Sequence, residues 1–535
     1  MDSLDIISWF TSWTTLTTVI LLPLLYWYLL KPYNYWSKRG IRGPKPVPIV
    51  GNDLQTFISP MPLVELEWFK KYGKIYGVYR RDKPVLTIAK PELIKTILVK
   101  DFHLFPDRKT RRINHEVLSK NLFFSEGEDW KRYRSITSPT FTSGKMKKMY
   151  PMIRECLKEY LKTLDDLAIN KSDINLKDMN GNFTMDVIAT CAFATKTNAH
   201  KEPNNAFVIN ARKIFDFSFV RVLGLLVLPK QILELIDLKS ASDESSNQFF
   251  IQLTKHVVKQ RKDEPNSHQK YNDFIQLLVD AHNNTGQQLP DENDVNEAHH
   301  VNDGEEEREV ERKVLSGSVV NKHLTELEIM AQGWIFFVAG YETTATTLTF
   351  CSYELALNPK VQDRLYEEIE TAVDANGEIS YDKLSKLPFL DSVLSETLRL
   401  YPPVLRLDRR VVTDYKLGDT GIQLFAGQEV EIPVYAIHHS DEFYPNAHQF
   451  DPDRFMPENR HKIIPYTYLP FGAGPRNCIG MRFALMEAKL GLAHIIRRFR
   501  FFKSPQTAVP LEFKPVTRLC AAKQVVVGIE MRNIS

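Results

Sequence analysis

The chain begins with a long apolar stretch, since residues 6–30 carry no charge and are mostly Ile, Leu, Val, Trp, Phe, Tyr and Thr. A helix of that length can span a hydrocarbon core of about 30 Å. Tryptophan and tyrosine gather towards its two ends, as interfacial aromatic residues do. A cleaved signal peptide is the alternative, but the first five residues contain two aspartates and no basic residue. The pattern predicts a retained membrane anchor over residues 1–30.

Residues 31–52 then become basic and rich in proline. An excess of Lys and Arg beside an anchor marks its cytosolic side, so the rest of the chain is expected in the cytosol. The prolines at 44, 46 and 48 lack amide donors and keep the backbone extended. This segment is expected to be a stiff linker, with a simple loop as the alternative.

The remaining pattern, over residues 53–535, predicts a mainly α-helical body with a small β-rich lobe. Residues 75–89 alternate around a polar turn at 80–83, which predicts a hairpin, and Pro91 is expected to open a helix through Leu98. Most later segments repeat apolar residues with a helical period. The clearest are 146–165, 248–260, 324–357, 359–373 and 381–400.

Residues 282–320 break this pattern, because they are polar, contain an acidic block at 304–309 and have few apolar positions. Such a segment buries too little apolar surface to offset the entropy of ordering. We expect an exposed, disordered insert, in which His299 and His300 are solvated rather than metal ligands.

Composition excludes some classes of protein. The chain of 535 residues is 43% hydrophobic and 25% charged, as in ordinary globular proteins. The net charge of +3, from 69 basic and 66 acidic residues, gives no general attraction to nucleic acid. Five scattered cysteines without a CxxC pair indicate a reducing compartment. They are Cys156, Cys191, Cys351, Cys478 and Cys520.

One cysteine lies in an unusual loop, residues 471–480, which holds three glycines and a proline around Cys478. Glycine permits positive φ and close approach to a flat ligand. Loop amides, the following helix N-terminus and Arg476 are expected to favour a thiolate, a known fifth ligand of haem iron. A lone cysteine could equally be a small buried hydrophobic residue.

A second segment, Ala339 to Thr344, lies inside the helix expected over 324–357, whose start has a capping-box spacing at Thr325 and Glu328. A threonine hydroxyl that bonds back one turn can open the helix and leave room for oxygen and water. Glu342 beside Thr343 could relay protons. Alternatively, the threonines only satisfy their own backbone.

These segments resemble the cytochrome P450 family. Residues 471–480 match its pattern Phe-x-x-Gly-x-Arg-x-Cys-x-Gly, residues 339–343 match Ala-Gly-x-Glu-Thr, and Glu396, Arg399 and the run 452–455 look like its structural ion triad. The motifs occur in the family's order, and the resemblance covers roughly residues 40–532. Within the family the chain is similar to the mammalian drug- and steroid-oxidising group and to thromboxane synthase.

The resemblance implies a P450 fold with haem b, and roles for individual residues. It implies that Cys478 ligates the iron, Thr343 hydrogen-bonds dioxygen and Glu342 delivers protons. It also implies that Glu396, Arg399 and Arg454 lock the chain behind the cysteine loop. The residues it assigns to the cofactor are Trp130, Arg134, Arg406 and Arg476 at the propionates, Phe471 in the loop, and Arg108 as a weaker candidate.

The expected partners are inferred from cofactor motifs that the sequence lacks and from the basic and apolar segments that it contains. No nicotinamide or flavin fingerprint is present, so electrons are expected from a separate NADPH–cytochrome P450 reductase, with cytochrome b5 as a further candidate. Lysines and arginines at 131–132 and 145–148 could meet an acidic partner or simply be solvated. The apolar run 215–228 is either core or a loop that dips into the bilayer near a substrate entrance.

The sequence therefore predicts a monooxygenase of the endoplasmic reticulum membrane that hydroxylates a lipophilic steroid, fatty acid or xenobiotic. One alternative is an isomerase that rearranges a lipid peroxide without dioxygen or reductase. A non-enzymatic haem carrier is a second alternative, and the substrate itself stays open.

Overall fold

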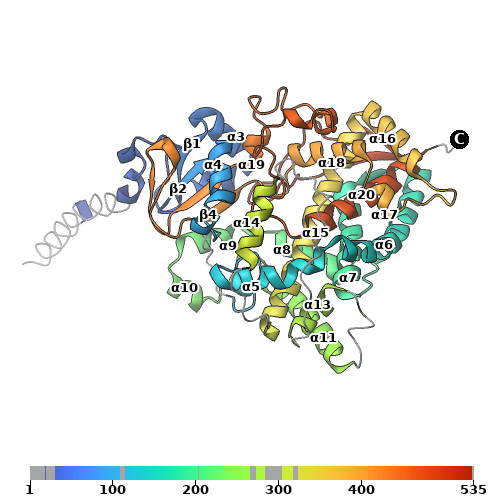
Figure 1. Cartoon of the computed structure of the whole chain (residues 1–535), viewed down its shortest axis with the longest axis horizontal. Coiled ribbons are helices and arrows are strands. Elements are labelled where there is room, and N and C mark those ends of the chain that lie inside the picture. The colour runs from blue at the N-terminus through green and yellow to red at the C-terminus, as the bar shows by residue number, and fades with distance from the viewer. Residues whose placement is uncertain are drawn as a thin grey trace, which may run out of the picture.

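A computed structural model describes residues 18–19, 30–108, 115–202, 204–264, 271, 273–282, 304–316 and 323–532. A small β-rich lobe lies at one end of the molecule, and the rest is mostly helical (Figure 1). This arrangement confirms the mainly α-helical class with a minor β region. The anchor expected over residues 1–30 lies almost wholly outside the described part of the chain. No helix within that described part has the length and apolar character needed to cross a membrane.

The β lobe contains a four-stranded sheet in the order β1-β2-β7-β4. Its strands are β1 (Ile75–Arg80), β2 (Lys83–Ile88), β4 (Leu407–Arg410) and β7 (Glu429–Ile432). Strands β1 and β2 pair antiparallel from Ile75↔Ile88 to Arg80↔Lys83, which confirms the expected hairpin. Around the sheet lie α2 (Asp53–Ile58), α3 (Met61–Tyr72), α4 (Pro91–Lys95), the π-helical turn η3 (Thr96–Lys100) and α19 (Val434–His438).

Smaller sheets complete the β structure. They are β3 (Asp173–Asn175), β9 (Val526–Met531) and β8 (Phe499–Phe502), and the pair β5 (Tyr415–Lys416) and β6 (Gln423–Leu424). The helices of the body up to residue 282 are α5 (Gly127–Thr137), α6 (Ser143–Ile169), α7 (Leu176–Phe193), α8 (Ala206–Phe215), α9 (Phe219–Val227), α10 (Lys230–Leu235), α11 (Glu244–Asp263) and α13 (Phe274–His282). Those that follow are α14 (Glu305–Ser316), α15 (Glu326–Leu357), α16 (Pro359–Ala372), α17 (Tyr381–Leu384), α18 (Pro388–Leu400) and α20 (Met481–Arg498).

Helix α15 is the central element, packed against α7, α11, α18 and α20. The Thr325 hydroxyl accepts from the amide of Glu328, whose carboxylate accepts from the Thr325 amide, so the expected capping box is confirmed. Glycines allow close packing along this helix. A Cβ at Gly333 would lie 2.4 Å from Thr254 Cγ2, and one at Gly340 would lie 2.7 Å from Ile188 Cδ1.

The structure corrects the linker expected over residues 31–52. Trp36 is buried, and its indole donates to the carbonyl of Val78 at 3.0 Å. The Asn52 side chain accepts from the amide of Tyr79 at 2.8 Å and donates to the carbonyl of Lys45 at 3.1 Å. Residues 36–52 therefore pack along β1 as part of the β lobe, because strand-edge donors and acceptors there need partners.

Two further expectations are corrected. The helix expected over 381–400 is divided into α17 and α18, because Leu387 is extended before Pro388, whose ring disfavours a helical residue ahead of it.

Part of the insert expected to be disordered forms α14. Its Val310 packs on the core, and Glu309 pairs with Lys313 one turn later at 2.6 Å. The rest of 282–320 lies outside the described residues, apart from His282 and Gly304.

The expected ion triad is confirmed, and two of its members, Glu396 and Arg399, are fully buried. The Arg399 guanidinium donates two hydrogen bonds of 2.7 Å to the Glu396 carboxylate, and Arg454 Nε lies 3.4 Å from the same carboxylate. Arg399 also donates to the carbonyls of His438 and Ala447 at 2.7 Å. The pair therefore ties α18 to the irregular chain that leads to the cysteine loop.

We expect Arg399→Met to lower the free energy of unfolding by about 3–5 kcal/mol, because it leaves the Glu396 carboxylate buried without its partner. Urea unfolding followed by circular dichroism measures the change. The control is Lys523→Met, which removes an exposed pair with Glu512 and should cost less than about 1 kcal/mol. Equal losses in the two variants would contradict the stabilising role of the buried pair.

Candidate active site

The cysteine loop is anchored by its glycines and its own backbone. Gly472 and Gly474 have φ values of 73° and 69°, which confirms the expected need for positive φ. A Cβ at Gly474 would lie 1.9 Å from the carbonyl oxygen of Leu98, so the loop presses against η3. The amide of Cys478 donates to the carbonyl of Phe471 at 2.8 Å, which closes the loop just before α20 begins.

Cys478 remains accessible although residues 472–476 of the same loop are buried. Surrounding protein nevertheless raises the pKa of its thiol, because burial disfavours the charged form; the Gly480 amide, Arg134 and Arg108 oppose that shift. The loop amide thus favours the thiolate as expected, and the arginines that favour it are Arg134 and Arg108. A bound metal cation overcomes such a shift, because a coordinating thiol is deprotonated outright.

Three arginines gather beside this loop: Arg108, Arg409 and Arg476. Burial and the positive charge of Arg108 together lower the pKa of Arg476 to about 8 and that of Arg409 to about 9. Arg476 Nη2 donates to the carbonyl of Ser125 at 2.9 Å. No acceptor within the described residues reaches Nε or Nη1 of Arg476, or Nε of Arg409. The cluster thus presents buried donors with positive charge that suit an anionic ligand.

Trp130 and Arg134 come to this cluster from one face of α5, as their i, i+4 spacing predicts. The Arg476 guanidinium lies 4.4 Å from the centre of the Trp130 ring, a cation–π contact. Arg134 donates to the backbone carbonyl of Asn477 at 2.9 Å and to its side chain at 2.5 Å. Trp130 and Arg134 therefore brace the loop two residues and one residue before Cys478, respectively.

Arg406 does not join the cluster, which corrects the expectation for this residue. Its guanidinium forms ion pairs with Glu65 at 2.8 Å and Glu431 at 2.9 Å inside the β lobe. Arg409, which no sequence motif indicated, lies in the cluster instead. The available signal was its position three residues after Arg406, within β4, because side chains an odd number of residues apart along an extended chain point to opposite faces.

Most residues in the middle of helix α15 are buried, but one face of the helix there retains accessible surface. Ile335, Ala339 and Thr343 are four residues apart, and each retains accessible surface while their neighbours are mostly buried. Thr343 Oγ1 donates to the carbonyl of Ala339 at 2.7 Å, as expected for back-bonding. The helix remains continuous there, since a carbonyl oxygen can accept both this bond and the helical amide.

Glu342 has a partner that the sequence did not reveal. Lys177 Nζ on α7 lies 2.7 Å from the Glu342 carboxylate and 3.1 Å from the Thr346 hydroxyl. Successive helix residues point about 100° apart, so Glu342 turns towards α7 and away from the face of Thr343. Nothing in the sequence places Lys177 near α15, because the contact spans 165 residues.

The site therefore combines an accessible thiol on a glycine loop, a buried cationic cluster beside it and a largely apolar helical face with a hydroxyl. These features define a protein that binds an anionic cofactor through a sulfur ligand. The orphaned N–H groups of Arg476 and Arg409 fit carboxylates, and the accessible Cys478 fits a metal in that cofactor.

Comparison with known proteins agrees with this description. The sequence model of the family "Cytochrome P450" matches residues 41–302 and 301–526. Cytochrome P450 3A11 of Mus musculus is 34% identical over 535 residues, and cytochrome P450 3A2 of Rattus norvegicus is 35% identical over 535 residues; each alignment covers 99% of both chains. Cytochrome P450 3A14 of Cavia porcellus is 34% identical over 536 residues, again with 99% of both chains covered.

The chain belongs to the cytochrome P450 family. It is an oxidoreductase of the monooxygenase type, and its cofactor is haem b with a cysteine thiolate on the iron. When bound, the haem supplies the iron at which dioxygen is activated.

We expect Arg409→Met to weaken haem binding by on the order of tenfold, because it removes a charge-assisted donor to an anionic group. Transfer of haem to apomyoglobin, timed by absorbance, measures the loss. Arg406→Met is the matched control: it should retain haem like the parent but unfold at lower urea, since Glu65 and Glu431 lose their partner. Equal haem retention by Arg409→Met and the parent would exclude Arg409 from the cofactor site.

Proposed function

We propose that this chain is a haem-thiolate monooxygenase of the endoplasmic reticulum membrane that hydroxylates a lipophilic substrate, with Cys478 as the iron ligand. The observation that carries the proposal is the cluster of Arg108, Arg409 and Arg476 at the cysteine loop. The buried positive charge of this cluster favours binding of carboxylates. Arg134 and Trp130 hold that cluster against the loop. Phe471 supports the loop as the acceptor for the Cys478 amide.

Thr343 and Glu342 are the residues proposed to handle oxygen and protons. The Thr343 hydroxyl lies on the accessible face of α15, where it can donate to dioxygen after it releases the Ala339 carbonyl. Glu342 is held by Lys177, so it can deliver a proton only when that ion pair loosens or a water connects it to Thr343. Lys177 therefore holds the Glu342 carboxylate on the side of α15 that faces α7.

The proposed substrate class rests on an exposed apolar surface. No residue of α9 is buried, and Val220 is 76% exposed; Leu235, at the end of α10, is 85% exposed. An apolar surface of this kind suits contact with a bilayer. The run 215–228 is thus interpreted as a membrane-facing segment through which a steroid, fatty acid or xenobiotic reaches the site.

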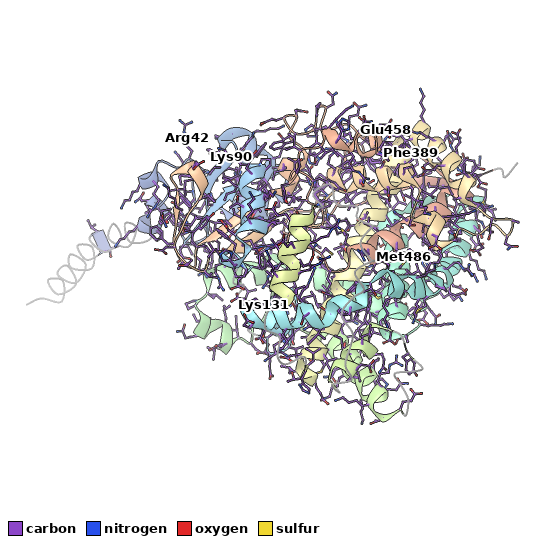
Figure 2. All side chains as sticks on the ribbon, in the orientation of Figure 1. Arg42, Lys90, Lys131, Phe389, Glu458 and Met486 are labelled. Atoms are coloured by element: carbon purple, nitrogen blue, oxygen red, sulfur yellow. The ribbon has the colours of Figure 1, made fainter. Side chains whose placement is uncertain are left out.

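Electrons are proposed to come from NADPH–cytochrome P450 reductase, with cytochrome b5 as a further donor. Lys148 on α6 is exposed and could contact an acidic partner, whereas the exposed Lys147 pairs with Asp382 at 3.0 Å. Lys131, which Figure 2 labels on α5, pairs with Glu128 of its own helix at 2.7 Å. Arg132 pairs with Glu328 at 2.6 Å, so it contributes less to such a contact than its position in the sequence suggests.

Replacement of the thiol tests the iron ligand. We expect Cys478→Ala to lose the strongly red-shifted Soret band that thiolate-ligated haem gives after reduction and addition of carbon monoxide, because no other sulfur lies in this loop. Cys520→Ala, which removes a buried cysteine elsewhere, is the control and should keep the band. An unchanged band in Cys478→Ala would overturn the assignment.

Replacement of the hydroxyl tests the reaction. We expect Thr343→Ala to consume NADPH in the presence of reductase but to form product on the order of 10²-fold more slowly, since a positioned donor is lost. Hydrogen peroxide should account for the missing product, and Thr343→Ser should recover most of it.

The same assay separates the alternative function. An isomerase that rearranges a lipid peroxide would turn over without NADPH or reductase. Its Thr343→Ala variant would therefore show no uncoupling of NADPH consumption from product formation. The threonine on the accessible face of α15 favours the monooxygenase, because an isomerase needs no donor for dioxygen.

A further inference from the structure

Helix α14 lies against the cysteine loop and the elements beside it. It packs on α5 and on η3 (Figure 1). Glu306 forms an ion pair of 2.6 Å with Lys95, next to η3, and Glu311 forms one of 3.1 Å with Arg134 on α5. The buried Glu307 carboxylate lies 3.5 Å from the amide nitrogen of Gly474 in the loop itself.

The helix is acidic and its partners are cationic. Residues 305–316 contain five glutamates against two arginines and one lysine, so the helix carries a net charge of about −2. One of its partners, Arg134, also donates to Asn477, the residue before Cys478. Helix α14 thus covers positive charge that lies close to the proposed iron ligand.

An electron donor must approach this same loop, because the loop carries Cys478. A donor with an acidic face would be attracted by Lys95 and Arg134, the cations that α14 already neutralises. Helix α14 and an acidic donor would therefore compete for the same two cations, Lys95 and Arg134.

We propose that α14 is a built-in competitor for the electron-donor docking surface, which consists of Lys95, Arg134 and the cysteine loop around Gly474. A donor protein with an acidic face displaces the helix when it docks. The proposal rests on the separate electron donor of the proposed function. The outer contact of α14 suits reversible displacement, because the Lys95 and Glu306 side chains are 32% and 47% exposed and ion pairs of that kind are weak and salt-sensitive. In the second pair Glu311 is 31% exposed, and Arg134 is buried beneath the helix.

The test uses the full-length haem protein in bilayer nanodiscs and purified NADPH–cytochrome P450 reductase at low ionic strength. We expect Glu306→Gln with Glu311→Gln to bind reductase about three- to tenfold more tightly than the parent, because the competing state is weakened. Glu306→Lys, which repels Lys95 at an exposed position, should act in the same direction. Glu309→Gln is the matched control, since it removes one charge from α14 but only a pair within the helix.

Amide hydrogen exchange of residues 305–316 provides the second measurement. Reductase should speed their exchange in the parent, and the carbon monoxide spectrum of each variant shows that the haem site is intact. Equal affinities for all variants, with α14 still protected in the complex, would overturn the proposal and leave the proposed function standing. Absence of reductase binding to the parent and to every variant would overturn the proposed donor, and the docking surface with it.

Discussion

The structure depends on a rule of low-dielectric interiors: a buried charge must have its partner in place. Glu396 and Arg399 are both fully buried, and Arg399 uses its remaining donors on the carbonyls of His438 and Ala447. The pair is therefore satisfied only when the chain after β7 has reached its final position. The His438 ring then accepts from the amide of Leu469, two residues before the cysteine loop. The ligand loop is thus positioned by charges remote from the chemistry.

The cofactor site inverts that rule. Arg476 has only a long ion pair of 3.5 Å with Asp107, and both Arg409 and Arg476 retain buried donors that no acceptor in the described chain reaches. Such an arrangement lowers the free energy of unfolding of the protein without cofactor, and binding of an anionic cofactor restores it. The raised pKa of Cys478 follows the same logic, because its thiolate is stabilised by the metal rather than by the fold. Cofactor binding and folding are therefore coupled.

Local patterns predicted much of this fold. The hairpin at 75–89 followed from alternation and a polar turn, and α15 followed from its apolar period and the capping box at Thr325. Prediction was wrong where a distant partner decided the outcome. Arg406 is drawn into the β lobe by Glu65 and Glu431, and the acidic residues of α14 become helical because Lys95 and Arg134 neutralise them.

By itself the sequence determined the family, the reaction class and the motif that contains Cys478, because short motifs with fixed spacing impose their chemistry wherever they fold. Only the tertiary structure decided which charges meet. Lys177 reaches Glu342 across 165 residues, Arg409 rather than Arg406 joins Arg476, and α14 comes to lie on the cysteine loop. Pairing between charges depends on distance and burial in three dimensions, and neither quantity is encoded in the spacing of residues along a chain.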